Sequence, residues 1–262
     1  MGILNATPDS FSGDGRDARS ALAHGLALIE AGADMLDVGG ESTRPGAQQV
    51  DEAEEIYRVE ALVAKLVANT RVPLSIDTMK PAVARRAVAA GAAMWNDVTA
   101  LRHASDSAAT AAELGCEVVL MHMRGDPRTM QIAPTYADVV TEVIEFLEEQ
   151  AEVAIAAGVD RAKIWLDPGI GFGKTLQHNL ALLKALPRVV ALGFPVLLGA
   201  SRKGFIGKID PTARSPADRL GGSLAVALAG ARAGVAAVRV HDVYETTQAL
   251  SVEAAISEDG LG

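Results

Sequence analysis

The sequence predicts an α/β fold, a single-domain (β/α)8 (TIM) barrel with its active site at the C-terminal ends of the strands. Short strand-like runs alternate with longer Ala- and Leu-rich amphipathic runs along all 262 residues. This alternation is typical of parallel βαβ units. We count eight strand-like runs, the number in a (β/α)8 barrel, whereas a doubly wound open sheet remains the alternative on pattern alone. Because no linker or change of composition divides the chain, we expect residues 1–262 to form one domain.

The expected strands are short and rich in branched apolar residues, as buried parallel strands are. They span residues 2–5, 35–39, 74–77, 94–98, 118–122, 164–167, 196–199 and 238–241.

The helical runs between them carry their own start and stop signals. Asp51 opens an acid-rich first turn that suits the helix dipole, and Thr135 with Asp138 is typical of a capping box. Ser215 followed by Pro216 predicts another helix start. A glycine closes five of the runs just before the next strand, where a C′ glycine is expected. These are Gly32, Gly91, Gly115, Gly158 and Gly234.

Composition excludes several classes of protein. With 24 basic against 33 acidic residues the net charge is −9, which argues against a general nucleic-acid binder. No run reaches the roughly 18 apolar residues of a membrane span, so we expect no membrane insertion. The single cysteine, Cys116, allows no internal disulfide and fits a reducing, cytoplasmic location.

Polar residues stand at the ends of most expected strands, where a buried strand should be apolar. In a barrel these ends converge on one mouth, and a buried carboxylate is costly unless it is paired or binds something. Any one of these residues has about even odds of being structural, but so many on one face indicate a ligand site. They are Asn5, Asp37, Asp77, Asn96, His122, Asp167, Arg239 and His241.

Arg239 and His241 lie two residues apart, so their side chains point the same way. An Arg and a His that project together suit an anion such as phosphate. The alternative is an ion pair between Arg239 and the nearby Asp242 or Glu245.

Arg202 and Lys203 follow the seventh strand, near the usual phosphate end of a barrel, although a solvated basic loop is the alternative. The segment 167–175 looks like a P-loop, but Pro168 stands where the first glycine is needed. The same segment also fails the dinucleotide fingerprint, so neither ATP nor NAD is expected. The sequence also contains no Cys/His spacing for zinc and no serine-hydrolase elbow.

Two segments carry a more specific signal. Residues 5–12, Asn-Ala-Thr-Pro-Asp-Ser-Phe-Ser, and 37–46, Asp-Val-Gly-Gly-Glu-Ser-Thr-Arg-Pro-Gly, resemble the signature loops of the dihydropteroate synthase family. These are the folate-pathway enzymes that sulfonamides inhibit. One departure is Ala6, where the family usually has Val. The resemblance continues in order through residues 75–78, 96–98, 167–172, 199–203 and 239–241.

The resemblance implies a transferase of tetrahydrofolate biosynthesis. Members join 6-hydroxymethyl-7,8-dihydropterin pyrophosphate to para-aminobenzoate, giving 7,8-dihydropteroate and pyrophosphate by a dissociative (SN1-like) substitution. It further implies a homodimer, and Asp77, Asp167 and Lys203 as catalytic residues. Two alternatives remain: a pterin-dependent methyltransferase of the same superfamily, and a pterin-binding protein without catalysis.

The resemblance also assigns binding residues. The pterin set is Asp77, Asn96, Met121, Asp167, Phe172, Gly199 and Lys203. The pyrophosphate set is Asn5, Thr43, Arg44, Arg239 and His241, with Mg²⁺ touching Asn5. The para-aminobenzoate set is Phe11, Pro45 and Ser201. The pterin assignment is chemically reasonable. A carboxylate such as Asp167 can accept the two parallel N–H donors of a pterin edge, as it accepts those of an arginine guanidinium.

Overall fold

A computed structural model describes residues 1–6, 17–41, 50–125 and 130–257. Each of the eight expected strands is present in this part of the chain. The strands are β1 (Gly2–Asn5), β2 (Leu36–Gly39), β3 (Leu74–Asp77), β4 (Met94–Asp97), β5 (Glu117–Met121), β6 (Ile164–Asp167), β7 (Leu197–Leu198) and β8 (Ala237–Val238). The last two are shorter than the sequence predicts.

The strands close into a ring, which excludes the open-sheet alternative. β1 to β6 pair in parallel in chain order, and β7 pairs in parallel with β8. Single bridges join the two groups, one between Leu166 and Val196 and one between Gly2 and Val240. Hydrogen bonds between these two segments continue beyond the assigned strands, since the Ala236 N–H donates to the Val196 carbonyl at 2.9 Å and the Arg239 N–H to the Leu198 carbonyl at 3.0 Å.

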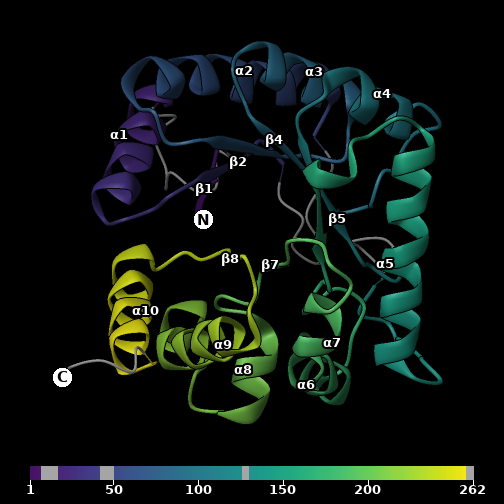
Figure 1. The fold of residues 1–262 in the computed structure, drawn as a ribbon. Helices are drawn as coiled ribbons and strands as arrows, with labels where there is room; N and C mark the ends of the chain where they lie inside the picture. Colours follow the sequence, from purple (N-terminus) through teal and green to yellow (C-terminus); the bar gives the residue numbers. More distant parts are fainter. Residues whose placement is uncertain (7–16, 42–49, 126–129, 258–262) are drawn as a thin grey trace.

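Helices form an outer layer around the strands (Figure 1). They are α1 (Asp17–Glu30), α2 (Glu52–Asn69), α3 (Pro81–Ala89), α4 (Ser107–Leu114), α5 (Val139–Ala156), α6 (Leu176–Lys184), α7 (Leu186–Val190), α8 (Gly204–Ile209), α9 (Leu220–Ala233) and α10 (Val243–Ser257). Two 3-10 turns, η2 (Arg161–Lys163) and η3 (Pro216–Arg219), precede β6 and α9. Among the helices in the described ranges, none combines the length and apolar character needed to cross a membrane.

Most predicted helix signals are confirmed, and one is wrong. Asp51 caps α2 by accepting the Ala53 N–H at 3.1 Å, and all five predicted glycines have positive φ. Thr135 does not cap α5. Asp138, the residue directly before the helix, caps it by accepting the N–H groups of both Val140 and Thr141. Asp138 is therefore the cap itself rather than the reciprocal partner in a capping box.

The barrel interior changes from apolar to polar along the strand direction. Met94, Val119 and Ala237 belong to an apolar cluster at the floor of the barrel. The cavity at the opposite end of the barrel is lined by the residues two positions further along the chain, which are Asn96, Met121 and Arg239. Arg239 directly follows the end of β8. Since side chains alternate across a strand, a step of two keeps each pair on the inner face. The main hydrophobic core lies between the strands and the helices, so the packing of the fold does not depend on the polar residues at the C-terminal ends of the strands.

Candidate active site

A cavity of about 670 Å³ lies at the C-terminal ends of the strands. Every residue that the family resemblance assigns to the site and that falls within the described ranges lines this cavity. These residues are Asn5, Asp77, Asn96, Met121, Asp167, Phe172, Gly199, Ser201, Lys203, Arg239 and His241. The other four predicted residues, Phe11, Thr43, Arg44 and Pro45, lie outside the described residues.

Arg239 lies between two carboxylates at the centre of the site. Its Nε donates to Asp37 Oδ2 at 2.5 Å and its Nη2 to Asp77 Oδ2 at 2.7 Å. Asn96 Nδ2 also donates to Asp37 Oδ2, at 3.1 Å. The predicted alternative for Arg239, an ion pair with Asp242 or Glu245, is therefore wrong. Asp37 lies beneath the cavity and orients both Arg239 and Asn96.

The charges of Arg239, Asp37 and Asp77 do not balance, because one guanidinium pairs with two carboxylates. Within the described ranges, Asp37 Oδ1 and Asp77 Oδ1 are buried and meet no hydrogen-bond donor. Burial raises the pKa of Asp77 to about 7, while Arg239 opposes the rise and Asp37 adds to it. A carboxylate with an unused oxygen at the cavity is suited to a ligand that supplies a donor or a positive charge.

Asp167 ends β6 and lines the same cavity. Its Oδ1 accepts the Gly169 N–H at 2.7 Å, and burial raises its pKa to about 6. Lys203 approaches from the β7 side, with its Nζ 3.8 Å from the centre of the Phe172 ring. This is cation–π geometry, so the ammonium and the ring form one unit at the cavity wall.

An apolar wall faces these charged groups. Met121, Met130 and Phe172 pack with Val98 in one buried cluster, and all four line the cavity. Methionine side chains adapt to flat and irregular ligands, since the thioether is flexible and polarizable. The site therefore combines a polar rim that can recognise the edge of a heterocycle with an apolar wall that can contact its face.

The loops after β7 and β8 are tied together. Ser201 Oγ lies 3.1 Å from His241 Nδ1 and accepts the His241 N–H at 3.2 Å. Arg202 Nε donates to Asp242 Oδ2 at 2.9 Å, and a second hydrogen bond joins the same two side chains. The basic loop is thus fixed by an ion pair, in contrast to the solvated loop that was the alternative.

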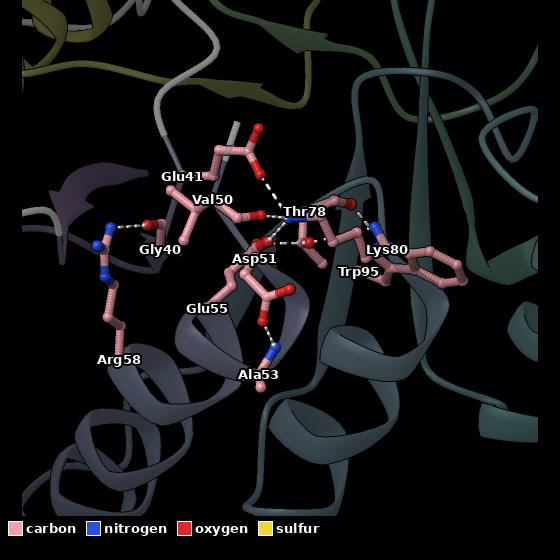
Figure 2. A network of polar contacts seen from close by, with 10 residues as sticks. All are labelled: Gly40, Glu41, Val50, Asp51, Ala53, Glu55, Arg58, Thr78, Lys80 and Trp95. Atoms are coloured by element: carbon pink, nitrogen blue, oxygen red, sulfur yellow. Dashed lines mark hydrogen bonds and ion pairs between the residues drawn. The ribbon is translucent and has the colours of Figure 1, made fainter. Parts of the chain in front are cut away.

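A buried ion network lies beside the mouth, between α2 and the loop after β3 (Figure 2). Lys80 Nζ donates to Glu41 Oε2 at 2.6 Å, to the Val50 carbonyl at 2.6 Å and to Glu55 Oε2 at 2.7 Å. Thr78 Oγ1 donates to the other oxygen of Glu55 at 2.7 Å. Glu41 lines the cavity, so Lys80 connects the cavity edge to the first turn of α2.

Sequence reasoning missed several residues of the site. Lys174, Asn179 and Arg219 line the cavity, yet Lys174 was considered only as part of a failed P-loop pattern. A lysine directly after three alternating glycines was the available signal. His122, a predicted polar strand end, contacts Lys174 instead of lining the cavity, with Nδ1 2.8 Å from the amine.

Comparison with known proteins agrees with this geometry. Residues 1–241 match the family described as pterin binding enzyme. A dihydropteroate synthase of Neisseria meningitidis serogroup B is 48% identical over 259 residues, which cover 96% of this chain and 90% of that protein.

Two solved structures extend the likeness to the fold. Dihydropteroate synthase of Xanthomonas albilineans with 4-aminobenzoic acid has a TM-score of 0.93 and 50% identity, covering 99% of this chain and 93% of that one. The enzyme of the same organism in complex with 7,8-dihydropteroate has a TM-score of 0.90 and 47% identity, covering 99% and 94%. The chain therefore belongs to the pterin-binding enzymes, in the dihydropteroate synthase family.

Proposed function

We propose that this protein joins 6-hydroxymethyl-7,8-dihydropterin pyrophosphate to para-aminobenzoate, releasing 7,8-dihydropteroate and pyrophosphate. The observation that carries the proposal is that residues suited to the edge of a heterocycle and residues suited to an anion line one cavity, in a chain of this family. The amine nitrogen forms a bond to the exocyclic methylene carbon of the pterin. The C–O bond to pyrophosphate breaks with its electron pair on oxygen, and one amine proton passes to solvent.

The pterin fits the deep part of the cavity. The ionised Asp167 carboxylate accepts the amino group and the adjacent ring N–H, a planar donor pair. Asn96 both donates and accepts, which suits the mixed edge of the ring. Lys203 donates to ring acceptors, while Met121 and Phe172 contact the faces of the ring.

The leaving group and the second substrate occupy the outer part. Arg239 supplies positive charge and N–H donors for pyrophosphate, and His241 offers its imidazole ring beside it. Ser201 lies beside His241, near the carboxylate of para-aminobenzoate. These anion contacts favour the synthase over a pterin-dependent methyltransferase, which has no pyrophosphate to hold. The same contacts also favour a catalytic protein over the second alternative, a protein that binds a pterin without catalysis.

Mg²⁺ fits this donor set as an ion brought with the pyrophosphate. The described residues contain no group of three acidic, His or Cys side chains that could hold a metal alone. Asn5 lines the cavity and offers one amide oxygen, and Mg²⁺ commonly takes its remaining ligands from phosphate and water. When bound, the ion would neutralise negative charge on the leaving group.

A dissociative mechanism suits the charges of the site. As the C–O bond breaks, positive charge develops on the exocyclic methylene and spreads into the pterin. Asp77 and Asp167 stabilise this charge from two sides of the mouth, where burial strengthens the interaction. An aromatic amine is a weak nucleophile, but a carbocation needs no strong one, so no activating base is required.

Ligand binding tests the assignment of subsites. We expect calorimetry to show pterin binding by the wild type and its loss in Asp167→Ala. A sulfonamide should compete with para-aminobenzoate but not with the pterin. Unchanged pterin affinity in Asp167→Ala would contradict the proposed pose.

We further propose a homodimer in the cytoplasm. The family resemblance supports the dimer, and the absence of any cysteine partner for Cys116 in the sequence supports a reducing compartment. Light scattering of the purified protein tests the dimer, and a monomer mass would refute it.

A further inference from the structure

A buried lysine holds the loop 168–175, which joins β6 to α6. Lys174 is only 2% exposed. Its Nζ donates to the carbonyl oxygens of Gly169 at 2.9 Å, Phe172 at 3.0 Å and His122 at 3.2 Å. These three carbonyl groups surround the amine, and the His122 ring nitrogen Nδ1 lies 2.8 Å from it. The loop therefore wraps around its own lysine and is tied to the end of β5.

The same loop is also held by α6, and it packs closely against the residue that follows β5. Asn179 of α6 is buried, and its Oδ1 accepts the Gly171 N–H at 2.7 Å. Gly169 has φ +67°, and a Cβ at this position would lie 1.9 Å from the His122 carbonyl oxygen. Backbone thus packs directly on backbone where the loop crosses the end of β5.

The loop carries two parts of the proposed pterin site. The Gly169 N–H donates to Asp167 Oδ1 and so sets the direction of that carboxylate. Phe172 places its ring under the Lys203 ammonium, 3.8 Å away. Lys174 binds the carbonyl groups of Gly169 and Phe172, the two residues through which the loop acts on the site.

We propose that Lys174 is a positioning residue of the pterin site, acting mainly through the Phe172 ring and to a smaller extent through Asp167. This inference rests on the proposed function. A lysine suits the task because its three N–H bonds spread toward separate acceptors, whereas the planar fork of arginine does not. The surrounding ionisable groups are His122, which contacts the amine, and Asp167, Lys203 and Arg124, which act on it through their charges.

The first test is the variant Lys174→Met, which keeps the length of the side chain and removes its donors. Lys65→Met, at an exposed lysine of α2, is the matched control. We expect Lys174→Met to weaken pterin binding and raise the KM for the pterin substrate by about five- to tenfold, as misplacing an aromatic contact should. The KM for para-aminobenzoate should stay within about twofold, as should both constants in the control.

A double-mutant cycle with Phe172→Leu separates positioning from general damage. If Lys174 acts mainly through the ring, Lys174→Met should weaken pterin binding less than about twofold in the Phe172→Leu background. An unchanged pterin affinity in Lys174→Met, or the same loss of affinity in both backgrounds, would overturn the proposal. A wild type that binds no pterin at all would instead overturn the proposed function.

If Lys174→Met shows no cooperative melting, Asn179 provides the second test of loop positioning. Asn179→Leu removes the acceptor for the Gly171 N–H, whereas Asn179→Asp keeps that acceptor and loses only the Nδ2 donor, which binds the Thr175 carbonyl at 2.8 Å. We expect weakened pterin binding in Asn179→Leu and recovery of part of the affinity in Asn179→Asp. Equal affinity in the two variants would contradict loop positioning.

Discussion

Replacing Lys80 by methionine should strongly destabilise the protein. The Lys80 side chain is 11% exposed and bridges Glu41, which is 9% exposed, and Glu55, which is 1% exposed. Methionine fills the space of the lysine stem but leaves two carboxylates beside each other without their cation. Removing one partner of a buried ion pair costs about 3–5 kcal/mol, because the remaining charge stays buried and unpaired.

The pH dependence of this loss has a defined sign. Burial already raises the pKa of Glu55 above its ordinary value, against the opposing effect of Lys80. Without Lys80 the pKa of Glu55 rises further. A carboxyl group whose folded pKa exceeds its unfolded pKa costs stability as the pH rises through the folded value. The deficit of Lys80→Met should therefore be larger at about pH 8 than at about pH 5.

Urea unfolding at both pH values measures the effect. Arg86→Met is the matched control, since Arg86 pairs with Glu60 at the surface, where the side chains are 57% and 37% exposed. This control should lose only about 0–1 kcal/mol. The double variant Lys80→Met/Glu55→Gln should recover part of the loss. A Lys80→Met deficit no larger than that of Arg86→Met, or one that grows at low pH, would refute the reasoning.

Three further changes test other parts of the account. Burial raises the pKa of Asp167 to about 6, so the ionised side chain costs stability above that pH. The variant Asp167→Asn should therefore raise the free energy of unfolding by about 1–3 kcal/mol at about pH 8, and this gain should vanish toward about pH 4. Urea titrations at both pH values check this, and a loss of stability at high pH would contradict it. Gly169→Ala should cost about 3 kcal/mol or more, whereas Gly115→Ala, also at positive φ but with open space around its Cβ, should cost about 1 kcal/mol. Similar melting temperatures for the two variants would argue against the packing described. Chelation of Mg²⁺ should abolish turnover and leave the melting temperature unchanged, and a large fall in melting temperature would indicate a structural metal instead.

The sequence was sufficient to predict the barrel and most of the described site. Strand ends in a parallel barrel meet at one mouth, so polar residues at those ends had to lie near one another. This is why Asp77, Asn96, Asp167 and Arg239, which are scattered along the chain, line one cavity.

Pairings between distant residues were not predictable in the same way. Asp37 and Arg239 are 202 residues apart, and the only ion-pair partners that local reasoning offered for Arg239, as the alternative to an anion, were acidic residues close to it in sequence. The choice depends on which strands become neighbours when the ring closes. Lys174 was missed for a related reason, since its partners are mostly backbone carbonyl groups whose positions depend on the tertiary fold.

Product formation tests the central claim most directly. Purified protein would be mixed with the pterin pyrophosphate, para-aminobenzoate and Mg²⁺, and both 7,8-dihydropteroate and pyrophosphate would be quantified beside an Asp77→Asn variant. The account predicts the two products in equal amounts from the wild type and a large loss of both in Asp77→Asn. A wild type that binds the pterin but forms neither product would contradict it.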